Sequence, residues 1–141
     1  MLQPKKLKWR RNHRVSYEGI ATRCNYVAFG DFGLEATQGN YVTDRQIESA
    51  RVVLSRYTKK GGKSWIRIFP QIGRTKKPAQ VRMGSGKGSI DHWAAVVKKG
   101  TVMFEIGGLP EADAKAALKQ CGYKLNVTSK VVKKGQEVVV K

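Results

Sequence analysis

The chain has 141 residues, 40% of them apolar, which is enough for one domain with a modest core. Its 28 lysines and arginines against 10 acids give a formal net charge of +18, far more than solubility requires. This balance is typical of a protein that binds nucleic acid. A membrane surface is the other anionic partner to consider. However, no stretch approaches the ~20 apolar residues of a spanning helix, and neither expected helix pairs a broad apolar face with a basic one strongly enough to lie in a membrane interface.

The first residues, Met1-Leu2-Gln3-Pro4-Lys5-Lys6, lack the apolar core of a signal peptide, so we expect a cytoplasmic protein. Cys24 and Cys121 are far apart in the chain, and we expect buried thiols rather than a disulfide or a zinc site. No spacing of histidine, cysteine or acidic residues indicates a metal site. We therefore expect neither a metal nor a cofactor.

Residues 1–23 are expected to form a basic arm, in which all the cations up to residue 14 precede the first acid. No helical or strand period runs through the segment, and in isolation it should be unfolded because it buries too little apolar surface. Against RNA it could fold, with arginines on phosphates and aromatic rings on bases. A solubilising tail would explain the lysines but not the interleaved Trp9 and Tyr17. The proposed RNA-binding cations of the arm are Lys5, Lys6, Lys8, Arg10, Arg11 and Arg14.

Two short strands are expected next, at residues 26–29 and 34–36, around turn signals at Gly30, Asp31 and Gly33. A second turn at 38–40 leads through Tyr41 and Val42 toward the first helix.

The first helix is predicted by a capping box in which Thr43 is followed by Gln46. Ile47, Ala50, Leu54 and Tyr57 recur at helical spacing and predict its buried stripe. Gly61 and Gly62 end it. The remaining faces carry cations, which we interpret as part of one RNA-facing surface rather than an ordinary solvated face: Arg45, Arg51, Arg56, Lys59 and Lys60.

The clearest strand is at residues 65–69, Trp-Ile-Arg-Ile-Phe, which Pro70 ends. A long loop over 71–89 follows, with several cations and no acid. Three of its glycines alternate with small or basic residues, so no side chain prevents the backbone from approaching a partner closely. A segment of this kind can lie close to several phosphate groups at once. The RNA-binding residues expected here are Arg74, Lys76, Lys77, Arg82, Gly84, Gly86, Lys87 and Gly88.

A nucleotide-binding loop is the first alternative for these glycines. The Walker pattern requires a glycine where Val81 stands and a serine or threonine where Gly88 follows Lys87. The dinucleotide pattern requires a third glycine where Ser89 stands, and no helix that would hold the phosphates begins here. The sequence therefore favours a polyanion-binding loop over a nucleotide site or a loop without function.

Residues 91–98 and 101–106 predict a hairpin through Lys98-Lys99-Gly100 that forms the middle of the sheet, with Trp93 in the core. A short helix begins after Pro110. Glu111 and Asp113 in its first turn fit the helix dipole better than acid–base catalysis. Its predicted buried stripe is Ala114, Ala117, Leu118 and Cys121.

A last strand is expected to begin at 124–127, and residues 131–141 form either a short hairpin around Lys134-Gly135 or a tail. We find no repeat and no linker. The expected organisation is one domain over 1–141, with a basic arm at 1–23, a globular α+β core at 24–130 that includes the 71–89 loop, and a C-terminal tail at 131–141.

Several motifs occur in collinear order over residues 1 to about 130: Met1-Leu2-Gln3-Pro4-Lys5, Gly19-Ile20-Ala21, Thr43-x-Arg45-Gln46-Ile47-Glu48-x-Ala50-Arg51, Trp65-Ile66-Arg67-Ile68-Phe69-Pro70, Thr75-Lys76-Lys77-Pro78, Val81-Arg82-Met83-Gly84-Ser85-Gly86-Lys87-Gly88 and Glu105-Ile106-Gly107-Gly108. Together they resemble the bacterial-type large ribosomal subunit protein 16 family. The chain departs from the family at 126–128, Asn-Val-Thr, where a Pro-Ile-Lys-like run is usual, and its tail beyond Lys130 is longer.

This resemblance implies an α+β fold, a hammerhead-like sandwich with two helices packed on a mainly antiparallel sheet. It implies a non-enzymatic structural protein whose arm and glycine-basic loop bind large-subunit rRNA beside neighbouring large-subunit proteins. By motif, Lys5 to Arg14 and Lys76 to Lys87 would run into the rRNA, while Arg51 and Arg56 would face rRNA and tRNA. The family sits by A-site tRNA near the peptidyl transferase region, with P-site tRNA as a further candidate partner, and joins late in assembly.

Other classes of function fit less well. An RNA- or DNA-binding or nucleic-acid-modifying protein outside the ribosome would also use a basic surface, but no cysteine–histidine, paired-carboxylate or cofactor motif supports catalysis. A sequence-specific DNA binder would need the first helix to act as a recognition helix, and no helix precedes it at helix-turn-helix spacing.

Overall fold

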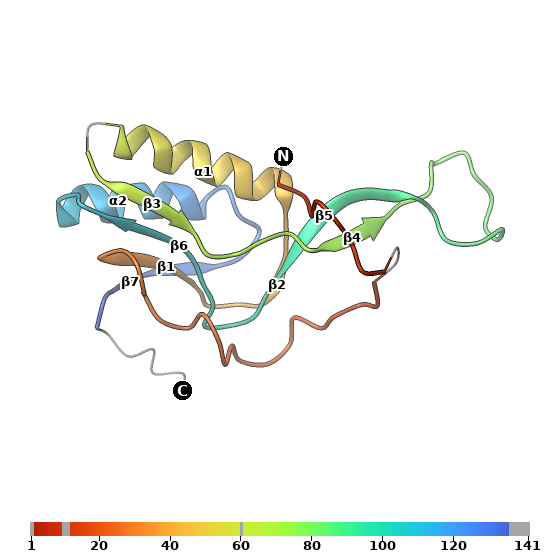
Figure 1. Ribbon diagram of the computed structural model, residues 1–141, viewed down its shortest axis with the longest axis horizontal. Helices are drawn as coiled ribbons and strands as arrows, with labels where there is room; N and C mark the ends of the chain where they lie inside the picture. Colours follow the sequence, from red (N-terminus) through yellow and green to blue (C-terminus); the bar gives the residue numbers. More distant parts are fainter. Residues whose placement is uncertain (1, 10–11, 60, 136–141) are drawn as a thin grey trace.

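The computed structural model describes residues 2–9, 12–59 and 61–135 (Figure 1). Arg10, Arg11 and Lys60, three of the proposed RNA-binding cations, lie outside the described residues. So does the segment 136–141 of the expected tail. The elements in chain order are β1 (Phe32–Ala36), β2 (Asn40–Thr43), α1 (Asp44–Thr58), β3 (Lys63–Ile66), β4 (Ile72–Thr75), β5 (Ile90–Val97), β6 (Val102–Gly107), α2 (Glu111–Gly122) and β7 (Ser129–Lys133).

The strands form two antiparallel sheets that share no strand pairing. One has four strands in the order β3-β6-β1-β7, and the other has three in the order β2-β5-β4. Both helices lie side by side over one face of the four-stranded sheet, while the three-stranded sheet extends away from them (Figure 1). This arrangement confirms the α+β fold with two helices on mainly antiparallel sheets.

The core lies between the two helices and the four-stranded sheet. Leu34 of β1 is opposite Phe104 of β6, and both side chains are almost completely buried. Ile47 and Leu54 of α1 pack against the same cluster. The stripe predicted for α2 is confirmed, since each of its members is fully buried: Ala114, Ala117, Leu118 and Cys121.

The capping box of α1 is also confirmed. Thr43 Oγ1 accepts a hydrogen bond from Gln46 N at 3.3 Å, and Gln46 Oε1 accepts one from Thr43 N at 2.9 Å. The helix ends at Thr58, and Gly61 and Gly62 both have positive φ, which a residue with a side chain rarely adopts.

The two cysteines differ in their surroundings. Cys121 is fully buried, and burial raises the pKa of its thiol to about 12, so it is an inert core thiol. Cys24 is a half-buried thiol on the segment before β1, in contrast to the expected burial.

The hairpin expected between residues 91–98 and 101–106 is wrong. The chain does turn at Lys98-Lys99-Gly100, but β5 pairs with β2 and β4, while β6 pairs with β1 and β3. Gly100 N donates to Ala36 O at 2.7 Å, so the turn directs β6 onto β1. Trp93 consequently lies in the three-stranded sheet and is half-buried rather than in the core.

The pairing of β5 is staggered. On one edge β2 pairs with its second half, from Thr43 opposite Ala94 to Asn40 opposite Val97. On the other edge β4 pairs with its first half, from Ile72 opposite Ala94 to Thr75 opposite Ile90. The two neighbours of β5 therefore overlap only at Ala94.

Several expected boundaries change. Residues 26–29 form no strand, and Gly33 lies inside β1 rather than in a turn. The strand expected at 65–69 is β3, which starts earlier and ends at the Ile66–Phe104 pair, although Arg67 N still donates to Met103 O at 2.9 Å. The 71–89 segment contains β4. The last strand is β7 rather than 124–127, and it crosses the expected border of the tail at residue 131.

No helix in the part of the chain that the structure describes is long and apolar enough to cross a membrane.

Candidate nucleic-acid interface

The loop at residues 76–89 projects from the far end of the β4–β5 ribbon, away from the helices (Figure 1). Lys76 N donates to Ser89 O at 3.2 Å and closes the base of the loop. Within it, Val81 N donates to Pro78 O at 3.2 Å, and the Lys77 ammonium donates to Gly84 O. Because all of these are hydrogen bonds within residues 76–89, the loop holds its shape without burying a hydrophobic cluster.

The loop glycines have two different roles. Gly84 and Gly86 have φ of +101° and +87° with open space around them, so they are required for backbone conformation. Ser85 between them also has a positive φ of 55°. A Cβ at Gly88 would lie 2.7 Å from Lys76 O, so this glycine lets the two sides of the loop base approach each other.

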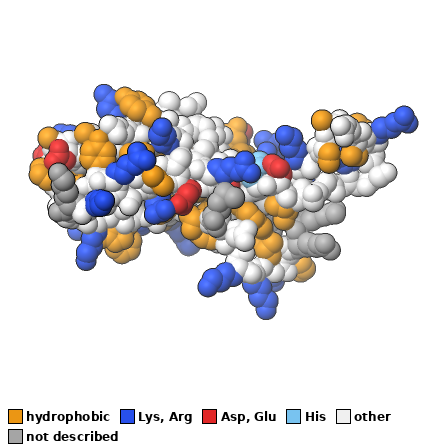
Figure 2. Space-filling view, turned by 90° about the horizontal axis from the view of Figure 1, so that it is seen from above, with side chains coloured by type: hydrophobic (Ala, Val, Ile, Leu, Met, Phe, Trp, Pro, Cys, Tyr) orange, Lys and Arg blue, Asp and Glu red, His pale blue; other side chains and the backbone are white. Residues whose placement is uncertain are grey.

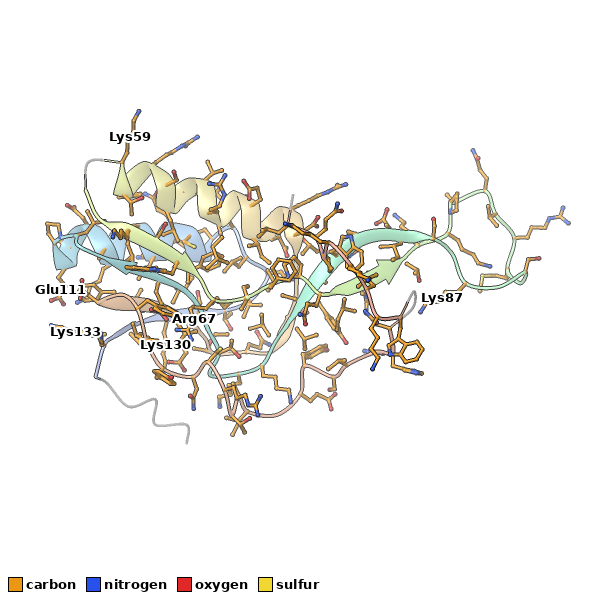
Figure 3. All side chains as sticks on the ribbon, viewed as in Figure 1. Lys59, Arg67, Lys87, Glu111, Lys130 and Lys133 are labelled. Carbon is orange, nitrogen blue, oxygen red and sulfur yellow. The ribbon has the colours of Figure 1, made fainter. Side chains whose placement is uncertain are left out.

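The cations of this region are not equally available. Arg82 and Lys87 are exposed and have no ion pair among the described residues, and Figure 3 labels Lys87 on the loop. Met83 between them is 94% exposed. Lys76 is exposed as well, whereas Lys77 is half-buried. Arg74 is half-buried on β4 and stacks its guanidinium over the Tyr41 ring at 4.6 Å from the centroid.

Tyr41 on β2 is a contact point that the sequence analysis missed. Its hydroxyl donates to Val15 O at 2.5 Å, and the edge of the Tyr17 ring meets it at 5.2 Å between centroids. A hydrogen bond with Tyr41 also raises the pKa of Arg14 above its ordinary value. One aromatic side chain thus joins the arm to the three-stranded sheet and holds Arg74. The signal was the alternation in β2, because a buried Val42 places its neighbour Tyr41 on the outer face.

The arm starts beside the N-terminal end of α1, and its later part runs along the side of the molecule opposite the helices before it enters β1 (Figure 1). Leu2 packs against the core, and Ala21 N donates to Lys99 O at 2.8 Å. Trp9 is 67% exposed. The described cations of the arm all face solvent: Lys5, Lys6, Lys8 and Arg14.

Helix α1 presents Arg45, Arg56 and Lys59 to solvent. Arg51 is exposed too, but its guanidinium binds both oxygens of Glu48, with Nη2–Oε1 at 2.5 Å and Nε–Oε2 at 3.0 Å. This contact lowers the pKa of Glu48. The outer face of α1 is therefore less positive than its arginines alone would make it.

Lysine and arginine side chains are spread along the length of the molecule, with few acids among them (Figure 2). Apart from Arg74 on β4, the proposed RNA-binding cations that the structure describes lie in three separate regions: the projecting loop, the arm and the outer side of α1 with its C-terminal end. The structure does not bring them together in one compact cluster.

A second feature missed by the sequence analysis is the buried carboxylate of Glu105. It accepts hydrogen bonds from Phe29 N at 2.7 Å, Gly30 N at 2.8 Å and Ala28 N at 3.2 Å, and it forms an ion pair with Arg67. Burial opposes its ionisation, but these donors outweigh burial and hold its pKa below the ordinary value. The backbone N–H groups of residues 28–30 therefore donate to this carboxylate instead of pairing in a β-strand.

Arg67 and Phe29 form the outer layer over Glu105. The Phe29 ring is 61% exposed, stacks on Trp65 at 6.3 Å between centroids, and lies 4.9 Å from the Arg67 guanidinium. Figure 3 shows Arg67 on the side of the four-stranded sheet away from the helices. No group of three potential metal ligands occurs within residues 2–9, 12–59 and 61–135.

Comparison with known proteins identifies the family of the chain. A family model described as ribosomal protein L16p/L10e matches residues 4–132. A large ribosomal subunit protein uL16 from Malacoplasma penetrans is 60% identical over 136 residues, which is 96% of this chain and 97% of that protein. A uL16 from Mycoplasmoides gallisepticum is 58% identical over 94% of this chain and 96% of its own length. A uL16 from Staphylococcus epidermidis is 52% identical over 95% and 93%. These relatives are named as ribosomal proteins and not as enzymes, and this chain belongs to the ribosomal protein L16p/L10e family.

Proposed function

We propose that this protein is a component of the bacterial large ribosomal subunit, in the cytoplasm, that binds large-subunit rRNA through the 76–89 loop and the basic arm. The main observation behind this proposal is the 76–89 loop. It projects beyond the folded body, contains no acid, and exposes Arg82 and Lys87 without an ion pair among the described residues. Near-full-length relatives named as large-subunit proteins support the same assignment.

The binding mechanism is electrostatic. Lysines and arginines displace condensed counterions from packed phosphates, and the open space at Gly84 and Gly86, which have no side chain, allows a phosphate to approach the loop backbone closely. If about six phosphates are engaged, the slope of log affinity against log salt is roughly −4 to −5. Contact with phosphates requires no catalytic group, and the protein acts as a structural element.

The finer part of the proposal concerns the neighbours of the protein in the ribosome. We place it by A-site tRNA near the peptidyl transferase region, with P-site tRNA as a further partner, and we propose that it joins the subunit late in assembly. The exposed Arg56 and Lys59 on α1 would face rRNA or tRNA. Arg51 would contribute less, because Glu48 already neutralises it.

The test compares incorporation into subunits with stability of the free protein. Arg82→Ala combined with Lys87→Ala should reduce the amount that co-sediments with the large subunit in a sucrose gradient, while the melting temperature stays nearly unchanged. Lys119→Ala with Lys124→Ala removes the same charge from exposed positions on and after α2 and is the matched control. A loop variant that incorporates as well as this control, or wild-type protein that stays at the top of the gradient, contradicts the proposal.

A further inference from the structure

A groove separates the arm from the sheet beneath it. One end has a volume of about 410 Å³ and the other about 520 Å³, and Val15, Phe69 and Val96 line both. The two hollows therefore adjoin each other at these shared side chains. Each lies within the range of ~300–1,000 Å³ that is usual for ligand pockets.

The wider chemistry of the groove is cationic at one end and aromatic at its centre. Arg23 from the arm, Arg67 from the segment after β3 and Lys98 from the end of β5 all line the 410 Å³ end. Its described lining residues include no carboxylate. Phe69 is 44% exposed and lines both hollows.

Arg67 gives this end a rigid wall. Its side chain is only 12% exposed and is held by the fully buried Glu105, while Nη2 lies 3.7 Å from Cys24 Sγ. Glu105 in turn fixes the backbone of residues 28–30. The wall is therefore organised before any partner arrives, so binding costs little additional side-chain order. The positive charge that Glu105 does not neutralise comes from Arg23 and Lys98.

We propose that this groove receives an unpaired nucleotide of the bound RNA, with its base against Phe69 and its phosphate between Arg23 and Lys98. The inference rests on the proposed rRNA-binding function and adds a binding mode that is distinct from the loop. A base in a duplex cannot offer its face to an aromatic ring, whereas an unstacked base can. An acid-free lining with cations on one side of a ring matches a nucleotide better than it matches a peptide.

The first experiment measures affinity of the full-length protein for a large-subunit rRNA transcript. Phe69→Leu keeps an apolar side chain but removes the aromatic face, and Phe69→Ala removes both. We expect Phe69→Ala to weaken binding by about 5- to 100-fold, the range that loss of a base–aromatic stack produces, and Phe69→Leu to weaken it by at least about fivefold. Tyr123→Leu, at a 72% exposed position after α2 and outside this groove, is the control and should bind as wild type.

The second experiment uses salt dependence and does not require a change at Phe69. Arg23→Gln combined with Lys98→Gln should reduce the slope of log affinity against log salt by about 0.7, because the two side chains share one single-stranded phosphate. A reduction of about 1.8 indicates duplex contacts and overturns the single-stranded mode. No reduction shows that the groove does not hold RNA.

These outcomes separate the two proposals. If wild type binds the transcript and Arg82→Ala with Lys87→Ala weakens it, but Phe69→Leu binds normally, only the groove inference fails, including the case in which a ribosomal protein fills the groove. If wild type does not bind the transcript, the rRNA-binding function fails as well. If both Phe69 variants unfold, the salt slope of the Arg23 and Lys98 variant decides.

Discussion

The four-stranded sheet with its two helices, called the body here, and the ribbon that carries the 76–89 loop differ in how their charged side chains are placed. In the body, even charged groups are buried and paired, as Glu105 is with Arg67 and three backbone amides. In the loop, Lys76, Arg82 and Lys87 face solvent, and only a few hydrogen bonds fix the backbone. The packing of the body therefore stabilises the fold, while the exposed cations of the loop remain available to pair with the negative charges of a partner.

The difference shows how a protein with a net charge of +18 can fold before it meets RNA. Mutual repulsion is low where cations are spread out and where carboxylates lie next to them, as for Arg51 and Glu48 on α1. Two cations that have no such partner among the described residues, Arg82 and Lys87, lie at the end of an extended ribbon. Changes in the two regions should therefore affect different measurements.

The largest expected effect is in the body. Glu105→Ala leaves the Arg67 guanidinium and three backbone donors without their acceptor, so we expect the free energy of unfolding to fall by about 3–5 kcal/mol. Urea denaturation measures this, and Glu111→Ala, an exposed acid at the start of α2, is the control. A loss below about 1 kcal/mol would show that the carboxylate is not a structural centre of the body.

The contribution of Glu105 to stability should also depend on pH. The folded pKa of Glu105 lies below its ordinary value of 4.5, so its contribution to stability is complete above that pH and is lost as the pH falls through the folded pKa. We expect the stability difference between wild type and Glu105→Gln to be constant from neutral pH down to the ordinary glutamate range and to shrink below it. Urea midpoints at a series of pH values test this, and a difference that grows on acidification would contradict it.

The smallest effect on stability is expected in the loop. Side chains at Gly84 and Gly86 are disfavoured in left-handed backbone, but the loop is not packed against the core and can change shape without disturbing it, so Gly84→Ala with Gly86→Ala should shift the melting temperature by less than about 1 °C. Affinity for rRNA should fall, because the loop tip changes shape. Gly135→Ala has the same kind of positive φ in open space beyond β7 and is the matched control for affinity. If the Gly84 and Gly86 double variant binds rRNA as tightly as the Gly135→Ala control, the backbone conformation of the loop tip is not required for binding.

Local signals made much of the fold predictable. Thr43 and Gln46 define the start of α1 within one turn, and the spacing of Ala114, Leu118 and Cys121 defines the buried side of α2. The glycine-basic loop was also visible, because its composition differs from that of any packed segment. These features depend on residues that are close in sequence.

The errors arose where a strand or a side chain depends on a distant partner. Nothing near Lys98 and Gly100 indicates that β5 pairs with β2 while β6 pairs with β1. Likewise, Glu105 reads as an outward residue of an alternating strand, and only the fold brings residues 28–30 and Arg67 over it. The placement of Tyr41 at the meeting point of the arm and Arg74 has the same cause.

The staggered pairing of β5 has a consequence for how far this protein can reach. Because β4 and β2 overlap on it only at Ala94, the outer half of the ribbon can lengthen without touching the part that is attached to the body. Two residues added to β4 and two to β5 near Thr75 and Ile90 would move the loop tip outward by about 7 Å and keep every side chain on its face. A single added residue in each strand would turn the loop over. The distance to which the loop extends into a partner can thus change in steps of two residues per strand while the structure of the body stays the same.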